Sequence, residues 1–206
     1  MNKICVLLDP GHGTRNYTKG KCSPDKQLYE GEWNREFANM LMQQLDNEGI
    51  TYHNIVPEDN DISLNNRCLR ANIVAKNFKQ HGFECVYISV HINAAASDVK
   101  YHDANGFSAW VYTNASEKSK ELGKLFVDEA KKMKLTGNRS IPKEGCNSAN
   151  FAVLRGTSMP AVLCENMFMD NKKDEEFLQS KQGKEMLIEL YINTIYNYMK
   201  KYNLSK

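Results

Sequence analysis

The sequence predicts an α/β fold in which helices are layered on a central sheet. Short apolar runs, typical of buried strands, alternate along the chain with longer segments whose apolar residues recur every three to four positions, as on one face of a helix. The 206 residues are 41% hydrophobic and 25% charged, an ordinary globular composition, and no repeat or linker-like stretch divides them. We therefore expect a single domain over residues 1–206.

The first half of the chain begins with an apolar run at residues 3–8, which ends at the turn-forming sequence DPG and indicates a buried strand. A loop rich in Gly, Lys and Ser follows over residues 11–26. Trp33, Phe37 and Leu41 then recur at steps of four, which predicts a helix over residues 30–47. The remaining elements expected here are a strand over 51–56, a helix over 64–78 and a strand over 84–91.

The second half continues the alternation. A strand is expected over residues 107–112 and a helix over 116–133. Two short apolar runs, 151–154 and 161–164, are predicted as strands. One long helix over about 174–202 closes the chain, because Leu187, Tyr191, Ile195 and Met199 share one helical face.

Charge and hydropathy exclude several classes of protein. A net charge of +2 gives no basic field of the kind that nucleic-acid binding requires, so we expect no nucleic-acid partner. No uncharged apolar stretch reaches the length of a transmembrane helix. The apolar run at residues 4–8 is too short for a signal peptide and lacks a small-residue cleavage site, so we expect cytoplasmic synthesis without a secretion signal.

The six cysteines are predicted to be free thiols. No pair has the CxxC spacing of a thiolate zinc site, and Cys5, Cys85 and Cys164 lie inside apolar strand-like runs, where free cysteine acts as a small hydrophobe. The others are Cys22, Cys68 and Cys146. Free thiols are typical of a chain made in a reducing cytoplasm.

Three polar residues stand where expected strands end. His12 follows the first strand between two glycines, His91 follows residues 85–90, and Glu165 follows residues 161–164. Ligand sites of open α/β sheets form outside the carboxyl ends of the strands. Two imidazoles and a carboxylate placed there suit a metal site with an acid/base partner, although structural histidines are the competing interpretation.

A fourth candidate lies at the start of the first helix, where Glu30 and Glu32 compete. Glu30 shares a helical face with Trp33 and Phe37, whereas Glu32 aligns with the polar residues Glu36, Asn39 and Gln43. This spacing favours Glu30 for an inward-facing role, but a carboxylate in the first turn is also stabilised by the helix dipole alone. The remaining histidines, His53, His81 and His102, are expected at the surface.

Four motifs occur in one order along the chain. They are residues 7–13 (LLDPGHG), Glu30 with Asn34, residues 89–94 (SVHINA) and residues 160–165 (PAVLCE). Together they resemble the zinc-dependent N-acetylmuramoyl-L-alanine amidases of the Amidase_3 (LytC-like) family. Supporting matches are Arg67, Ala71, Asn72, Gly106, residues 153–155, Phe168, Asn171 and Asp174. Residues 19–24 resemble a subgroup found in phage and prophage lysins.

The resemblance implies a twisted, mostly parallel sheet flanked by helices and one catalytic Zn²⁺. It implies that His12, Glu30 and His91 bind the metal and that Glu165 is the catalytic acid/base. Two departures concern the loop after Gly13, where Thr14 stands instead of a second glycine, and Arg35, where the family has leucine. The second departure leaves Glu32 open as the alternative ligand.

The reaction implied by the resemblance is hydrolysis of the bond between N-acetylmuramic acid and L-alanine, with peptidoglycan or muropeptides as the partner of a monomer. Arg139 and Arg155 are candidates for binding stem carboxylates, with plain surface charges as the equal alternative. Asn34 and Asn93 are candidates for holding the metal ligands, with helix-surface and turn asparagines as the equal alternative. Two hypotheses compete with this function: another zinc peptidase, such as a carboxypeptidase, and a non-catalytic wall-binding module. Release by a phage-type route, or a leader already removed, would bring the chain to the cell wall.

Overall fold

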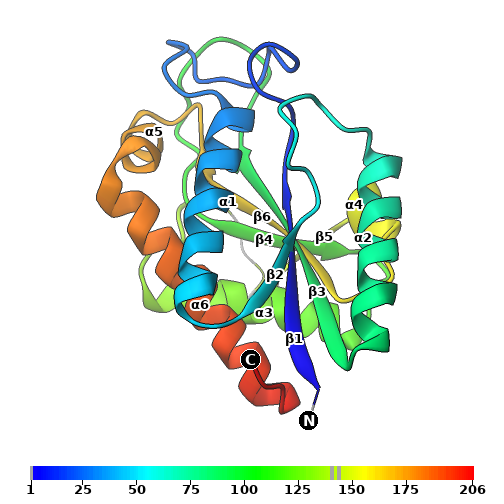
Figure 1. The fold of residues 1–206 in the computed structure, drawn as a ribbon. Coiled ribbons are helices and arrows are strands. Elements are labelled where there is room, and N and C mark those ends of the chain that lie inside the picture. The colour runs from blue at the N-terminus through cyan, green and yellow to red at the C-terminus, as the bar shows by residue number, and fades with distance from the viewer. Residues whose placement is uncertain (1, 140–141, 143–144) are drawn as a thin grey trace.

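A mixed, mostly parallel sheet forms the centre of the protein (Figure 1). The computed structural model describes residues 2–139, 142 and 145–206. Over these residues the strands lie in the order β2-β1-β3-β6-β4-β5. Strand β4 is antiparallel to β6, and every other neighbouring pair is parallel. The strands are β1 (Lys3–Pro10), β2 (Thr51–Asn54), β3 (Phe83–Asn93), β4 (Ser108–Tyr112), β5 (Asn147–Ala149) and β6 (Ala161–Phe168).

Helices cover both faces of the sheet. Alternate residues of β1 divide between the two faces: Ile4, Val6 and Leu8 pack beneath α1, α3 and α6, whereas Cys5 and Leu7 pack beneath α2 and α4. The helices are α1 (Glu30–Asn47), α2 (Leu64–Gln80), α3 (Glu117–Lys132), α4 (Ala152–Arg155), α5 (Lys172–Gln179) and α6 (Lys181–Tyr202). No helix in the described part of the chain is long and apolar enough to cross a bilayer.

The connections out of β1 create a switch point in the sheet. From β1 the chain passes through α1 to the edge strand β2, and then through α2 on the opposite face to β3, on the other side of β1. The carboxyl ends of β1 and β3 therefore lie side by side while their outgoing connections diverge. Such a point is where open α/β sheets hold their ligands.

Most expected elements are confirmed, with boundaries that move by a few residues, and three are wrong. The apolar run 151–154 is not a strand, because its residues fall in the short helix α4. Strand β6 does not end at Cys164 but continues to Phe168, so Glu165 lies within a strand. The closing helix is two helices, α5 and α6, because Ser180 ends the first and caps the second by accepting a hydrogen bond from Gly183 N.

The cysteine prediction is confirmed: all six side chains are unpaired. Strand β5, which has only three residues, was not expected from the sequence. Its short, polar sequence gives no strand-like hydrophobic pattern, and only pairing with β4 defines it.

Candidate active site

The turn after β1 places His12 at the carboxyl edge of the sheet. His12 has a left-handed backbone, with φ of 59°. Just before it, Gly11 lies against the ring of His91: a Cβ at this position would be 2.2 Å from His91 Cε1. Glycine is therefore the residue that lets the two imidazoles approach, and their ring centroids are 5.1 Å apart in an edge-to-face arrangement.

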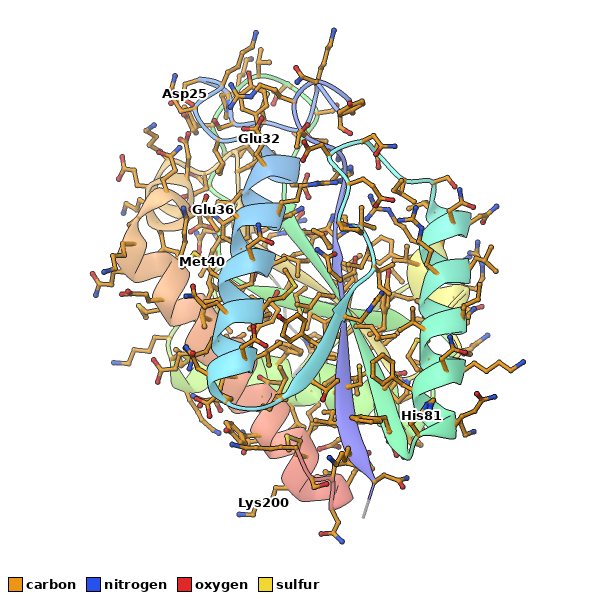
Figure 2. All side chains as sticks on the ribbon, in the orientation of Figure 1. Asp25, Glu32, Glu36, Met40, His81 and Lys200 are labelled. Carbon is orange, nitrogen blue, oxygen red and sulfur yellow. The ribbon has the colours of Figure 1, made fainter. Side chains whose placement is uncertain are left out.

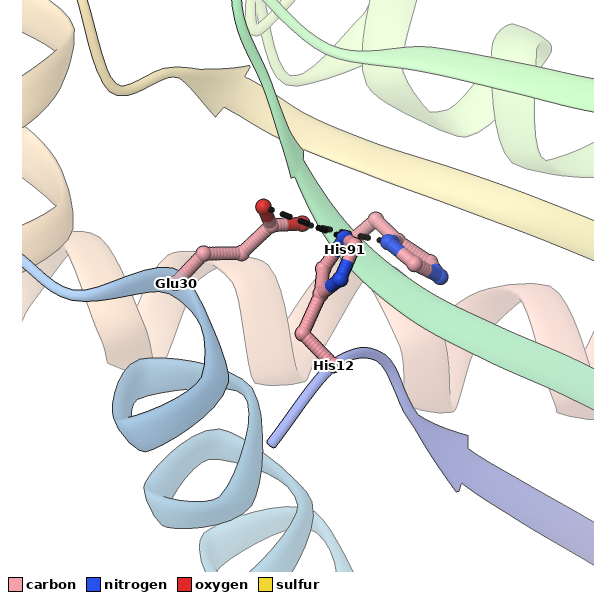
Figure 3. Close-up of side chains that lie close together, drawn as sticks. All are labelled: His12, Glu30 and His91. Carbon is pink, nitrogen blue, oxygen red and sulfur yellow. Dashed lines mark hydrogen bonds and ion pairs between the residues drawn. The ribbon is translucent and has the colours of Figure 1, made fainter. Parts of the chain in front are cut away.

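Glu30, the first residue of α1, points its buried carboxylate at both histidines (Figure 3). Its Oε1 accepts a hydrogen bond from Ile92 N at 3.0 Å and lies 3.1 Å from His91 Nδ1. Its Oε2 lies 3.4 Å from His12 Nε2. The start of α1 reaches this position because Gly31 packs directly on the backbone of the loop, where a Cβ would be 1.8 Å from Gly13 O.

Glu32 lies on the other side of the helix. Figure 2 shows it on the outer surface of α1, in line with Glu36 and Met40. Both of its carboxylate oxygens accept hydrogen bonds from Arg15, at 2.5 Å each. The structure therefore brings Glu30, and not Glu32, to the two histidines, on the helical face that the sequence spacing favoured.

The ionisation of these groups is coupled through their contacts. Burial lowers the pKa of His12. Burial also acts to lower the pKa of His91, but the hydrogen bond and charge of Glu30 outweigh it and raise that pKa. In turn, burial acts to raise the pKa of Glu30, and the two imidazoles lower it below its usual value. The contact between Glu30 and His91 therefore favours the charged form of both groups.

The three side chains fit a divalent metal ion. One ligand atom from each lies within 4.8 Å of the others, and this is the one such group of three found among the described residues. Ligand atoms around tetrahedral zinc lie about 3.3 Å apart, close to the separation of His12 and Glu30. Glu30 Oε2 is buried and has no hydrogen-bond partner among the described residues, which is the state of an oxygen with a lone pair free for a metal.

Glu165 lies beside this group on the next strand. Its Cα is in register with that of His91 across the β3–β6 pairing. Its Oε2 is buried without a hydrogen-bond partner in the described structure, and burial raises its pKa to about 7. A carboxyl group with this pKa can both accept and donate a proton near neutral pH.

A cleft opens over these side chains. Its volume is about 590 Å³, and His12, His91 and Glu165 all line it. Much of its remaining lining is apolar, formed by Ile62, Leu64, Phe151, Ala152, Val153 and Leu163. A neutral group such as an amide could enter this cleft and meet a carboxyl group and two imidazoles at its floor.

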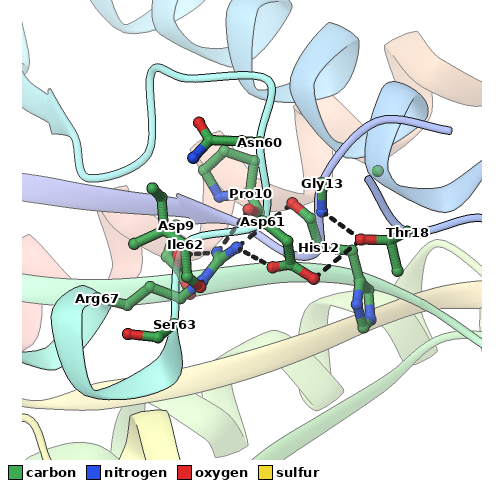
Figure 4. A network of polar contacts seen from close by, with 12 residues as sticks. Asp9, Pro10, His12, Gly13, Thr18, Asn60, Asp61, Ile62, Ser63 and Arg67 are labelled. Carbon is green, nitrogen blue, oxygen red and sulfur yellow. Dashed lines mark hydrogen bonds and ion pairs between the residues drawn. The ribbon is translucent and has the colours of Figure 1, made fainter. Parts of the chain in front are cut away.

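A network of polar contacts, without an assigned role in the sequence analysis, supports the floor of the cleft (Figure 4). Asp9 and Arg67 form a buried ion pair with 2.6 Å between Oδ1 and Nη1. Tyr87 and Ser89 both donate to Asp9 Oδ2, at 2.5 and 2.8 Å. Asp9 directly follows five apolar residues, so a carboxylate in need of a buried partner was a signal available in the sequence.

The two asparagines proposed to hold the ligands differ in what they contact. Asn34 donates to Gly11 O at 3.1 Å, one residue before His12. Asn93 accepts from its neighbour Ala94 N, a local turn contact. Asn166, which the sequence analysis did not single out, donates to His91 O at 3.0 Å and to Tyr191 Oη.

Arg139 and Arg155, the candidates for binding stem carboxylates, are not among the described residues that line the cleft. Arg155 donates to Asn150, and Arg139 lies over the ring of Phe168. His81 lies at the end of α2, far from the site (Figure 2), and His53 is exposed. His102 is part-exposed and pairs with Asp98. None of these three histidines joins the group at the sheet edge.

The chain is similar to known proteins over nearly its whole length. Residues 6–197 match the family profile described as N-acetylmuramoyl-L-alanine amidase. A curated relative, the probable cell wall amidase LytH of Staphylococcus aureus, is 27% identical over 182 residues, covering 88% of this chain and 54% of that protein. The chain thus spans about half the length of the curated relatives it matches.

Solved structures share the fold. One is the N-acetylmuramoyl-L-alanine amidase from Clostridium difficile 630, with a TM-score of 0.81 and 27% identity, covering 97% of this chain and 98% of that one. Another is the catalytic domain of CwlV, an N-acetylmuramoyl-L-alanine amidase from Bacillus (Paenibacillus) polymyxa var. colistinus. For CwlV the TM-score is 0.74 and the identity 25%, covering 96% of this chain and 98% of that one.

Proposed function

Because the chain belongs to the N-acetylmuramoyl-L-alanine amidase family, we propose that it hydrolyses the amide bond between N-acetylmuramic acid and L-alanine in peptidoglycan and so acts on the cell wall. The observation that carries this proposal is the convergence of His12, Glu30 and His91 at a cleft that His12, His91 and Glu165 line. Cleavage of an amide requires a polarised carbonyl, an activated water and a proton for the leaving amine, and this set of side chains can serve all three.

We assign one Zn²⁺ to His12, Glu30 and His91. Three protein ligands are the number that catalytic zinc sites use, since a fourth position must stay open. Glu30, through its Oε2, which accepts no hydrogen bond in the described structure, and the two imidazoles supply one ligand atom each. When bound, the ion supplies a Lewis acid that polarises the amide carbonyl and acidifies water.

Glu165 moves the proton in this proposal. Its carboxylate takes the proton of the attacking water and then delivers it to the nitrogen of the departing L-alanine. Its pKa of about 7 in the metal-free protein comes from burial. The register of β3 and β6 holds Glu165 next to His91 through the backbone pairing of the sheet, so neither residue depends on a mobile loop for its placement.

The decisive experiment is product analysis of digested peptidoglycan. We expect peptide stems with a new N-terminal L-alanine and glycan strands that stay intact. Release of single amino acids from the stem ends would instead indicate a carboxypeptidase. No products from wild-type protein that carries metal would indicate a wall-binding module.

Metal content tests the assigned ligands. We expect about one zinc per wild-type chain by elemental analysis, and loss of zinc in Glu30→Gln, which keeps the side-chain shape but removes the anionic ligand. Glu32→Gln is the matched control two residues away on the outer surface of the same helix. Equal zinc in Glu30→Gln and Glu32→Gln would refute the assignment.

A further inference from the structure

The guanidinium of Arg35 connects three segments around the metal-site turn. From the second turn of α1 its Nη1 donates to His12 O at 2.8 Å and to Gly31 O at 2.9 Å. Its Nε donates to Glu58 O, in the connection between β2 and α2, at 2.9 Å. One side chain thus joins the turn after β1, the start of α1 and a loop that belongs to the other face of the sheet.

The carbonyl of His12 receives a second guanidinium from the opposite side. Arg67, on α2, donates to the same oxygen through Nη2 at 3.3 Å and to Pro10 O through Nη1 at 2.8 Å. Figure 4 shows Arg67 reaching the peptide of His12. Helices α1 and α2, on opposite faces of the sheet, therefore both hold the peptide group of His12. The left-handed φ of His12 is uncommon for a residue other than glycine.

The backbone of His12 determines where its imidazole points. In the left-handed conformation the side chain faces Glu30 and His91, and a return to the ordinary extended region would rotate it away from them. Arg35 and Arg67, which both donate to the His12 carbonyl, oppose that rotation. We infer that Arg35 is a positioning residue of the metal site, which holds the His12 peptide so that its imidazole meets Glu30 and His91; the inference rests on the proposed function.

The surroundings of Arg35 indicate that it acts by orienting the His12 peptide and not through its positive charge. No ion pair between Arg35 and a carboxylate is found in the described structure, and the hydrogen bonds found for its guanidinium all go to backbone carbonyl oxygens. Burial and the nearby charge of Arg67 lower its pKa, although the charges of Asp59, Asp61 and Asp9 act in the opposite direction. A positive charge close to a metal site also repels the metal, which means that charge and positioning predict opposite effects of removing Arg35.

The test measures zinc affinity by competition with a chelator of known strength. Arg35→Leu keeps the aliphatic bulk and removes every donor. We expect its zinc affinity to fall about 10–100-fold, the usual effect of losing a group that orients a metal ligand. If only the charge of Arg35 mattered, the same substitution would tighten binding. Equal or tighter binding in Arg35→Leu would overturn the inference.

Two further variants complete the experiment. Arg35→Lys keeps the charge but cannot bridge several carbonyls, so we expect an intermediate loss; it decides the question if Arg35→Leu fails to fold. Arg70→Leu is the matched control, because Arg70 binds Ile55 O and the Glu58 carboxylate in the same loop without contacting His12. We expect Arg70→Leu to bind zinc like the wild type, and a loss as large as that of Arg35→Leu would also overturn the inference.

A spectroscopic readout separates positioning from general weakening of the fold. The visible absorption of the Co²⁺-substituted protein reports the geometry of the ligands, so we expect its bands to shift in Arg35→Leu and not in Arg70→Leu. Absence of zinc binding by the wild-type chain would refute the metal assignment itself. A wild type that binds zinc and an Arg35→Leu variant with the same affinity and spectrum would refute only the role of Arg35.

Discussion

Asp9 in β1 and Glu165 in β6 are carboxylates on the two strands that flank β3, yet their surroundings are opposite. Asp9 accepts hydrogen bonds from Arg67, Tyr87 and Ser89. Glu165 has a buried oxygen without a partner in the described structure. A buried polar group normally finds partners, so an orphaned one stores free energy that must be offset elsewhere. The comparison indicates that the contacts of Asp9 stabilise the fold, whereas Glu165 has the free oxygen that the proposed proton transfer requires.

The largest effect should come from removing the available carboxylate. We expect Glu165→Gln to lower the rate of peptidoglycan hydrolysis by about 10²–10⁴-fold, the usual contribution of a positioned acid/base group. Zinc content should stay at the wild-type level, because Glu165 is not among the assigned ligands. Turnover of purified muropeptides, normalised to bound zinc, measures this, and a loss below 10-fold would remove Glu165 from the mechanism.

The second effect concerns stability. Asp9→Asn leaves Arg67, at 2% side-chain exposure, without its buried anionic partner; only the exposed Asp61 remains. We expect the free energy of unfolding to fall by about 3–5 kcal/mol, since an unpaired buried charge is costly. Urea unfolding of the metal-free protein gives the value. The control is Asp61→Asn, because Asp61 is exposed and pairs with the same arginine at 3.2 Å; its effect should be about 1 kcal/mol or less.

The third effect is the pH dependence that Glu165 adds to that of the other shifted groups at the site. Its pKa in the folded, metal-free protein is about 7, above the ordinary value of 4.5, because burial disfavours the charged form. Its contribution to stability is therefore complete below pH 4.5 and is lost as the pH rises through 7, by up to about 3 kcal/mol. The difference in unfolding free energy between wild type and Glu165→Gln should change over this interval. A difference that does not vary with pH would contradict the buried, raised-pKa state of Glu165.

The smallest effect should come from the outer carboxylate of α1. Glu32 and Arg15 form an exposed ion pair, with side-chain exposures of 34% and 55%. We expect Glu32→Ala to change the free energy of unfolding by about 1 kcal/mol or less and to leave zinc content unchanged. Differential scanning calorimetry and elemental analysis check both. Loss of zinc in this variant would reopen the choice between Glu30 and Glu32.

Hydrophobic periodicity was enough to predict β1, α1 and β3, which position His12, Glu30 and His91. The face shared by Glu30, Trp33 and Phe37 predicted that Glu30 points inward, and all three side chains are buried. The errors came from short segments. Residues 151–154 are apolar without a length that separates strand from helix, and their helix α4 packs on α2. Polarity at Glu165 and Asn166 suggested the end of a strand, but Asn166 is satisfied inside the fold by His91 O and Tyr191.

The sequence by itself determined the order of elements, the candidate residues and, through the family motifs, which of them belong together. Only the tertiary structure decided how they meet: it aligned His91 with Glu165 across two strands, turned His12 into the left-handed region and placed Arg35 and Arg67 on its carbonyl. The physical reason is the distance along the chain over which each effect acts. Periodicity and turn chemistry act over a few residues and can be recognised locally. Hydrogen bonds and pKa values at the site depend on groups that are distant along the chain and become neighbours only when the sheet forms.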